Sequence, residues 1–256
     1  LNIYAYDEDI KNLYEHIDII KDAGPDALIV SDFGILNIVK NKLPDIDIHI
    51  STQTNTLNSE AVKFWKDFGA TRVILARELS IKQLAQIRKN VPDIELEVFV
   101  HGAQCVSLSG RCLLSDYMTH GERKANHGGC SQPCRWKYKL LEETRPGEYY
   151  EIEETARGTH ILSTKDLALI NYIPQLIEAG ADSFKIEGRT KSLYYVSAVA
   201  KAYRQAIDAY YNGEKPDPQE MFTQLLKIGN RGYTTGFYLD EQDHEGYSYD
   251  VSLSLI

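Results

Sequence analysis

The chain alternates between amphipathic stretches and short apolar runs, with a period of about 25 residues in its first half. Each amphipathic stretch has helical spacing and is followed by a Gly or Pro break, and each apolar run ends in polar residues. This pattern predicts helices at 9–23, 34–42, 59–68, 81–90, 167–179 and 192–211. It predicts strands at 1–5, 27–30, 46–50, 72–76, 96–100 and 183–186.

Regular alternation of strands and helices indicates parallel strands, and apolar runs without polar alternation indicate strands that are buried on both faces. We therefore expect an α/β fold, a TIM-type (β/α) barrel, in residues 1–211. Closure of such a barrel needs eight strands, so we expect it to be incomplete at the N-terminus. An opened sheet would expose strand edges, which favours association with a second copy or a homologous subunit.

Two segments depart from the alternation. Residues 140–160 are polar and rich in turn formers, and we expect an excursion there that includes a hairpin outside the barrel. Asn212-Gly213, followed by Pro216 and Pro218, marks a boundary before residues 212–256. We expect this last segment to be a C-terminal extension, because it is too short to fold alone.

All four cysteines lie in one stretch that follows the predicted strand at 96–100: Cys105, Cys112, Cys130 and Cys134. The Cys-x-x-x-Cys spacing of the last pair resembles a zinc knuckle, whereas four thiolates from one long irregular loop are also typical of an iron–sulfur cluster. Four unrelated buried thiols are the third alternative. A disulfide framework is not expected in a long chain with few cysteines and no apolar leader, which suits a reducing compartment.

Composition narrows the class of protein. With 43% hydrophobic residues the chain can form a sizeable core, and no apolar run approaches the roughly 20 residues of a membrane span, so we expect a cytoplasmic protein without a membrane partner. The net charge of −9 opposes a general nucleic-acid surface. Local basic density at 123–124 and 135–139, the second interleaved with aromatics, favours a small RNA contact, although 135–139 could equally be a solvated strand face.

The carboxyl ends of the predicted strands supply candidate site residues, because TIM-barrel active sites lie there. Three side chains could transfer protons: Glu78, His101 and Glu187. Four could bind a small anion or an RNA phosphate: Gln53, Arg77, Lys185 and Arg189. The alternative for the charged residues is a set of structural ion pairs. The sequence contains no serine elbow and no His-Glu-x-x-His motif, so a peptidase would need a mechanism that these motifs do not represent.

Two adjoining motifs carry a family resemblance: Glu97-x-Phe99-x-x-Gly102-Ala103-x-Cys105 and Gly110-x-Cys112-x-Leu114-Ser115. They resemble the signature of the collagenase-like peptidase family, peptidase family U thirty-two, with Gln104 in place of the family's usual aliphatic residue. Further similarity lies at 51–53, 76–78, 132–136, 185–189 and 231–236, so it covers nearly the whole chain.

The resemblance implies an oxygen-independent hydroxylation enzyme with a [4Fe–4S] cluster. The most similar branch hydroxylates tRNA, forming 5-hydroxyuridine at the wobble position with prephenate as the hydroxyl donor. Some relatives place a cysteine in the segment matching 165–168, where this chain has Ala168, so Cys134 would be the fourth ligand or one iron would stay open.

The family also leaves two other activities open: peptide-bond hydrolysis by a collagenase-like peptidase, and hydroxylation of a quinone precursor. The resemblance further implies relatives that extend beyond this chain at both ends, so we expect a fragment.

Overall fold

A computed structural model of the chain describes residues 1–105, 107–136, 153–155, 158–160, 165–214 and 217–239. Its centre is a sheet whose parallel strands lie in the order β1 (Ala27–Val30), β2 (Asp47–Ile50), β3 (Arg72–Ile74), β4 (Glu95–Ala103) and β8 (Ser183–Glu187). The predicted α/β architecture with parallel strands is confirmed. Across the described residues the sheet is open, so the predicted TIM-type barrel is not seen there.

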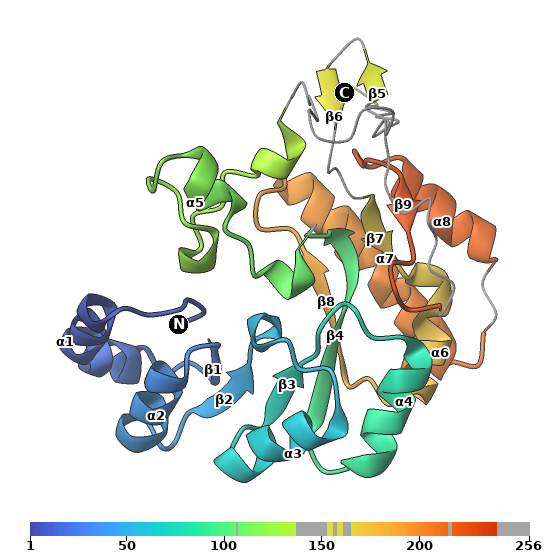
Figure 1. The fold of residues 1–256 in the computed structure, drawn as a ribbon. Coiled ribbons are helices and arrows are strands. Elements are labelled where there is room, and N and C mark those ends of the chain that lie inside the picture. Colours follow the sequence, from blue (N-terminus) through green and yellow to red (C-terminus); the bar gives the residue numbers. More distant parts are fainter. Residues whose placement is uncertain (106, 137–152, 156–157, 161–164, 215–216, 240–256) are drawn as a thin grey trace.

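Four helices alternate with the first strands and lie beside the sheet (Figure 1): α1 (Asp7–Ala23), α2 (Phe33–Lys42), α3 (Ser59–Phe68) and α4 (Ile81–Asn90). Local signals set their ends. Asp32 caps α2 by accepting hydrogen bonds from the backbone N–H of Gly34 at 2.8 Å and of Ile35 at 3.0 Å. Ser80 and Gln83 form a reciprocal capping box at the start of α4. The observed bounds of these helices agree closely with the bounds predicted from the periodicity of the sequence.

The predicted strand at 1–5 is wrong, because residues 1–6 contain no strand. The segment instead bonds to loops that follow the sheet strands. The Ala5 N–H donates to Asp32 at 3.3 Å, the Ser31 hydroxyl donates to the Ile3 carbonyl at 3.1 Å, and the Tyr4 N–H donates to the Asn126 carbonyl at 3.2 Å. Within the described residues β1 is thus an edge strand, and the predicted association through such an edge stays a prediction.

The predicted helix at 167–179 is also wrong in its first half. Residues Asp166–Ala168 form β7, which is antiparallel to the end of β4, and a 3₁₀ turn at Ile170–Tyr172 leads into α6 (Ile173–Glu178). Pro174 lies in the first turn of α6, where its missing N–H is tolerated. β3 ends at Ile74, so the last residues of β4 offer a free edge that β7 occupies.

The C-terminal part continues the same sheet. The long helix α7 (Leu193–Tyr211) is followed by α8 (Pro218–Leu226), which packs on α7, and by β9 (Tyr233–Thr234), which pairs with β7 in parallel. In the predicted excursion, β5 (Glu153–Thr155) and β6 (Gly158–His160) form an antiparallel hairpin. The rest of 140–160, and residues 240–256, lie outside the described residues, so the division into 1–211 and 212–256 stays a prediction.

The hydrophobic core lies between the sheet and its helices. Its fully buried side chains include Ile50, Ile74, Leu96, Leu169 and Leu176, whereas none of the described residues of 104–136 belongs to it. No described helix is both long and apolar enough to cross a membrane. The cysteine-bearing segment is therefore attached to a core that packs without it.

Candidate functional site at the carboxyl ends of the strands

The cysteine loop, residues 104–136 apart from the undescribed residue 106, folds into short turns. These are α5 (Leu114–Met118) and three 3₁₀ turns, η2 (Leu108–Gly110), η3 (Ala125–His127) and η4 (Pro133–Arg135). Figure 1 shows the loop around α5 beyond the carboxyl ends of the strands. The loop thus lies where the sequence placed the site.

Polar contacts hold the cysteine loop over β2 and β3. The Glu78 carboxylate accepts hydrogen bonds from the Ser109 N–H at 2.7 Å and from the Ser109 hydroxyl at 2.5 Å. The Arg111 Nε donates to the Gln53 carbonyl at 3.1 Å, and Gln53 Oε1 lies 3.5 Å from the Ser31 hydroxyl. Glu78 and Gln53 are therefore brought to the site, where both anchor the loop.

The four cysteines are not joined in disulfides. Cys105 is exposed and the other three are half-buried. The Cys112 sulfur accepts the Leu114 N–H and the Cys130 sulfur accepts the Gln132 N–H, both at 3.3 Å. Within the described part of the chain, no three Cys, His, Asp or Glu side chains converge as a metal-ligating group.

The donor set still suits a cluster in its chemistry. Iron–sulfur clusters take thiolate ligands, and N–H···S hydrogen bonds to those sulfurs tune them. As the turns are placed, however, they do not form a closed coordination shell, so coordination needs them to move closer together. The ligand assignment stays a prediction.

Arg77 is a half-buried cation directly after β3. Its Nη1 donates to the Ala103 carbonyl at 3.1 Å, and its Cζ lies 3.8 Å from the centre of the Phe99 ring. Burial lowers the pKa of the Arg77 guanidinium, and the negative charges of Glu187 and then Cys105 oppose that shift. Arg77, Glu187 and the first thiol thus share one charged neighbourhood.

Glu187 ends β8, and its Oε1 accepts the N–H of the exposed Arg189 at 3.2 Å. The approach of β8 to β4 is close at this point, because a Cβ on Gly102 would lie 2.2 Å from the Glu187 carbonyl oxygen. Gly102 also has φ +104°, a conformation that favours glycine. The glycine therefore sets the position of Glu187.

Lys185 lies inside β8, not at its end, and is engaged elsewhere. Its Nζ is 2.8 Å from Glu97 Oε1, and Glu97 also pairs with Arg72 at 3.1 Å and accepts the Ser183 hydroxyl at 2.8 Å. Burial would raise the pKa of the Glu97 carboxyl, but the hydrogen bonds and charges of these partners, Lys185 first, hold it below its ordinary value. The sequence reasoning missed Glu97, and a substrate role for Lys185 would require this ion pair to open.

His101 is fully buried and lies among the rings of Tyr195, Tyr203 and Tyr233, with centroid distances of 5.9, 5.5 and 5.4 Å. Burial lowers its pKa from 6.5 to about 4, although the negative charge of Asp166 acts in the opposite direction. His101 is therefore a neutral imidazole at neutral pH. It can accept a proton, but it lacks the second ring proton that an imidazolium could donate.

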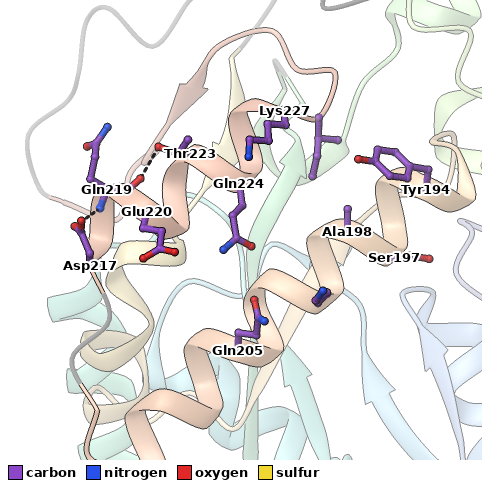
Figure 2. Close-up of a pocket in the computed structure, with 12 residues that line it drawn as sticks. Tyr194, Ser197, Ala198, Gln205, Asp217, Gln219, Glu220, Thr223, Gln224 and Lys227 are labelled. Atoms are coloured by element: carbon purple, nitrogen blue, oxygen red, sulfur yellow. Dashed lines mark hydrogen bonds between the residues drawn. The ribbon is translucent and has the colours of Figure 1, made fainter. Parts of the chain in front are cut away.

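A groove of about 870 Å³ lies elsewhere, between α7 and α8 (Figure 2). Its lining mixes the cations of Lys201 and Lys227 with the carboxylates of Asp217 and Glu220. None of the side chains that the sequence singled out lines it. The groove is therefore separate from the candidate site.

The sequence of the chain is similar to that of a known protein family. Peptidase family U32 matches residues 1–248. The chain belongs to peptidase family U32. This confirms the resemblance seen in the two motifs around the first cysteines.

Three relatives differ in the activities their names state. The chain is 38% identical to tRNA hydroxylation protein P of Haemophilus influenzae, over 99% of this chain and 64% of that protein. It is 40% identical to a 23S rRNA 5-hydroxycytidine synthase of Escherichia coli, over 82% of this chain and 30% of that protein. It is 35% identical to a collagenase of Porphyromonas gingivalis, over 94% of this chain and 59% of that protein. The chain thus spans less than two thirds of each relative.

Proposed function

We propose that this family member is an RNA hydroxylation enzyme that converts the wobble uridine of a tRNA to 5-hydroxyuridine without molecular oxygen. The observation that carries the proposal is the docking of a loop with four cysteines over strand ends that bear Arg77 and Glu187. Relatives named for hydroxylation of tRNA and of rRNA support it. We further propose that the parallel sheet is part of a TIM-type barrel, in which strand ends form the active site.

The four thiols would hold a [4Fe–4S] cluster, with zinc as the alternative: Cys105, Cys112, Cys130 and Cys134. A cluster supplies redox or Lewis-acid chemistry when bound. Ala168 lies in β7 opposite His101 and supplies no ligand, so Cys134 is the proposed fourth one.

The residues around the cysteine loop would bind the donor, accept protons and position the loop. Arg77 and Arg189 would bind an anionic hydroxyl donor, such as prephenate, or a phosphate through charge-assisted hydrogen bonds. Glu187 and His101 would accept protons, since His101 is neutral at working pH. Glu78 would position the cysteine loop, because both its oxygens accept from Ser109.

An RNA contact is proposed on the outer face of the cysteine loop. Leu113 is 71% exposed and Tyr117 is 78% exposed, and the exposed Arg123 and the half-buried Lys124 follow on the same loop. Aromatic faces stack on unpaired bases, and cations between them contact phosphates. The net charge of −9 limits this binding to a few phosphates, so its salt dependence should be shallow.

The cluster is tested by anaerobic purification followed by iron and acid-labile sulfide analysis. We expect iron and sulfide in the parent protein and loss of both in Cys105→Ala. Gln205→Ala, in the groove between α7 and α8, is the matched control and should keep both. Stoichiometric zinc without sulfide would contradict the cluster.

The reaction is tested by deleting the gene and analysing tRNA nucleosides by mass spectrometry. We expect 5-hydroxyuridine derivatives to disappear and to return with the parent gene, but not with Cys105→Ala. Unchanged nucleosides in a strain without a second family member would reject tRNA as the substrate.

A collagenase-like peptidase is the second candidate, favoured by the relative named a collagenase. Hydroxylation of a quinone precursor is a variant of the first candidate, the hydroxylation enzyme. Peptide hydrolysis that persists in Cys105→Ala, together with unchanged tRNA nucleosides, would favour the peptidase, because cleavage of a peptide bond needs no redox centre.

A further inference from the structure

The groove between α7 and α8 is lined on one side by a single face of α7. Tyr194, Ser197, Lys201 and Gln205 all line it, and they follow one another at spacings of three or four residues. Tyr194 is 70% exposed, and the other three are also exposed. With a helical rise of about 1.5 Å per residue, roughly 10 Å separate Tyr194 from Lys201. This face therefore presents an aromatic ring, a hydroxyl, an ammonium group and an amide in a row.

The charges of α8 divide the groove into two halves. Asp217 is the N-cap residue of α8, Glu220 lies in its first turn, and Lys227 is its C-cap residue. Figure 2 shows Lys227 toward Tyr194, whereas the two carboxylates lie toward the Gln205 end. A second cavity of about 370 Å³ shares Gln205 and Glu220 with the groove and continues it at that end. The groove therefore has a cationic half and an acidic half.

The two lysines of the cationic half are not neutralised within the described part of the chain. No carboxylate there forms an ion pair with Lys201 or Lys227. The next charges along α7, Arg204 and Asp208, pair with each other at 2.7 Å. Asp208 and Glu214 line the second cavity, so they add to the acidic half. A helix C-terminus favours a cation such as Lys227, but Lys201 lies in the middle of α7 and has no such local role.

The cationic half combines groups that bind single-stranded RNA. Unpaired bases stack on exposed aromatic rings such as that of Tyr194. Phosphates accept hydrogen bonds from ammonium groups such as those of Lys201 and Lys227, and from hydroxyls such as that of Ser197. Gln224, from α8, offers both a donor and an acceptor to a base edge. The carboxylates of the acidic half repel phosphates, so an RNA strand would be confined to the cationic half.

The cationic half adjoins the candidate site. α7 begins shortly after Glu187, the last residue of β8. A Cβ on Gly188 would lie 2.8 Å from a side-chain carbon of Val196, so the first turn of α7 packs against the residue that follows β8. Arg189 reaches the cysteine loop, because its Nη1 lies 4.0 Å from the position of a Cβ on Gly128. An RNA strand in the cationic half would therefore lie next to the strand ends.

We propose that Tyr194, Ser197, Lys201 and Lys227 bind a single-stranded segment of the RNA, beside the nucleotide that enters the candidate site. Its phosphates are bound by the two ammonium groups, and one of its bases stacks on the Tyr194 ring. The inference rests on the proposed function, because it assigns a second contact to the same RNA. It is distinct from the contact on the outer face of the cysteine loop.

The test is fluorescence anisotropy of the parent protein with a fluorescein-labelled anticodon stem-loop at several salt concentrations, without a hydroxyl donor. Lys201→Gln combined with Lys227→Gln should weaken binding about tenfold and reduce the salt slope by about 1 to 2. Lys11→Gln combined with Lys89→Gln removes the same charge from exposed positions on α1 and α4, and should leave the affinity nearly unchanged. Equal weakening by the two double variants would overturn the inference.

Substitutions of Tyr194 test the stacking. Tyr194→Ala should weaken binding about fivefold or more, whereas Tyr194→Phe keeps the ring and should bind like the parent. Tyr211→Ala is the matched control, because Tyr211 is 71% exposed at the other end of α7 and lies outside the groove. Parent-like binding of Tyr194→Ala, or equal losses in Tyr194→Ala and Tyr211→Ala, would contradict stacking on Tyr194.

The outcomes separate the groove from the reaction. If the parent protein does not bind the stem-loop, the groove contact and RNA as the substrate are both rejected. If the parent binds and the lysine and tyrosine substitutions in the groove have no effect, only the groove contact is rejected. If binding depends on these residues but no 5-hydroxyuridine forms, the groove contact is supported and the proposed reaction is rejected.

Discussion

His101 is a neutral imidazole enclosed by tyrosine rings, with a pKa lowered from 6.5 to about 4. The unfolded chain therefore binds its proton first as the pH falls, which removes stability between those two values. Asp166 and Lys191 are the charges that face the ring, and they act in opposite directions. We expect a loss on the order of 3 kcal/mol in the free energy of unfolding over this window.

Urea unfolding at a series of pH values checks this expectation. His101→Gln should flatten the dependence, whereas His16→Gln, on an exposed histidine, should keep it. Equal slopes in the two variants would show that His101 does not carry the effect.

Gly102 is the second residue for which we predict the effect of a substitution on stability. Gly102→Ala places a Cβ 2.2 Å from the Glu187 carbonyl oxygen, so β4 and β8 must separate. We expect a loss of more than about 2 kcal/mol in unfolding free energy. Gly213→Ala, also at positive φ but with open space around it, should cost only about 1 kcal/mol. If denaturant unfolding shows similar losses of unfolding free energy for Gly102→Ala and Gly213→Ala, the close approach of β4 to β8 is contradicted.

At the scale of elements, Glu97 joins three strands. It lies on β4 and bonds to Arg72 on β3 and to Lys185 on β8. Glu97→Ala leaves two partly buried cations without this partner, and we expect a loss of about 2 kcal/mol or more in unfolding free energy. Glu95→Ala removes an exposed partner of Arg72 and should cost less than about 1 kcal/mol. Guanidinium unfolding of both variants decides whether Glu97 has this role.

At the scale of the whole molecule, the cysteine loop and the core are separate. None of the loop's described residues belongs to the hydrophobic core, and polar contacts such as those of Glu78 and Arg111 attach the loop to the strand ends. Removal of a bound cluster by anaerobic chelation should therefore bleach the protein while the thermal unfolding of the sheet stays nearly unchanged. Circular dichroism melting before and after chelation measures this. Unfolding on chelation would mean that the cluster supports the fold itself.

The sequence by itself determined the features that local patterns encode. α3 and α4 were predicted with the bounds observed, because their apolar spacing and their caps at Asn58 and Ser80 act within a few residues. The parallel strands from β1 to β4 followed from the same alternation. The placement of the cysteines after β4 was likewise readable, since the carboxyl ends of parallel strands share one side of a sheet.

Only the tertiary structure decided which side chains meet. Lys185 lies near the end of the predicted strand 183–186 and was expected to bind a substrate, yet the register of β8 against β4 places it on Glu97. Residues 167 and 168 were predicted to begin a helix, but they belong to β7, which pairs with the free edge of β4, and Asp166 in the same strand meets Arg231. Such partners lie far apart in the chain, so their contacts depend on strand register and on burial, which no local pattern specifies.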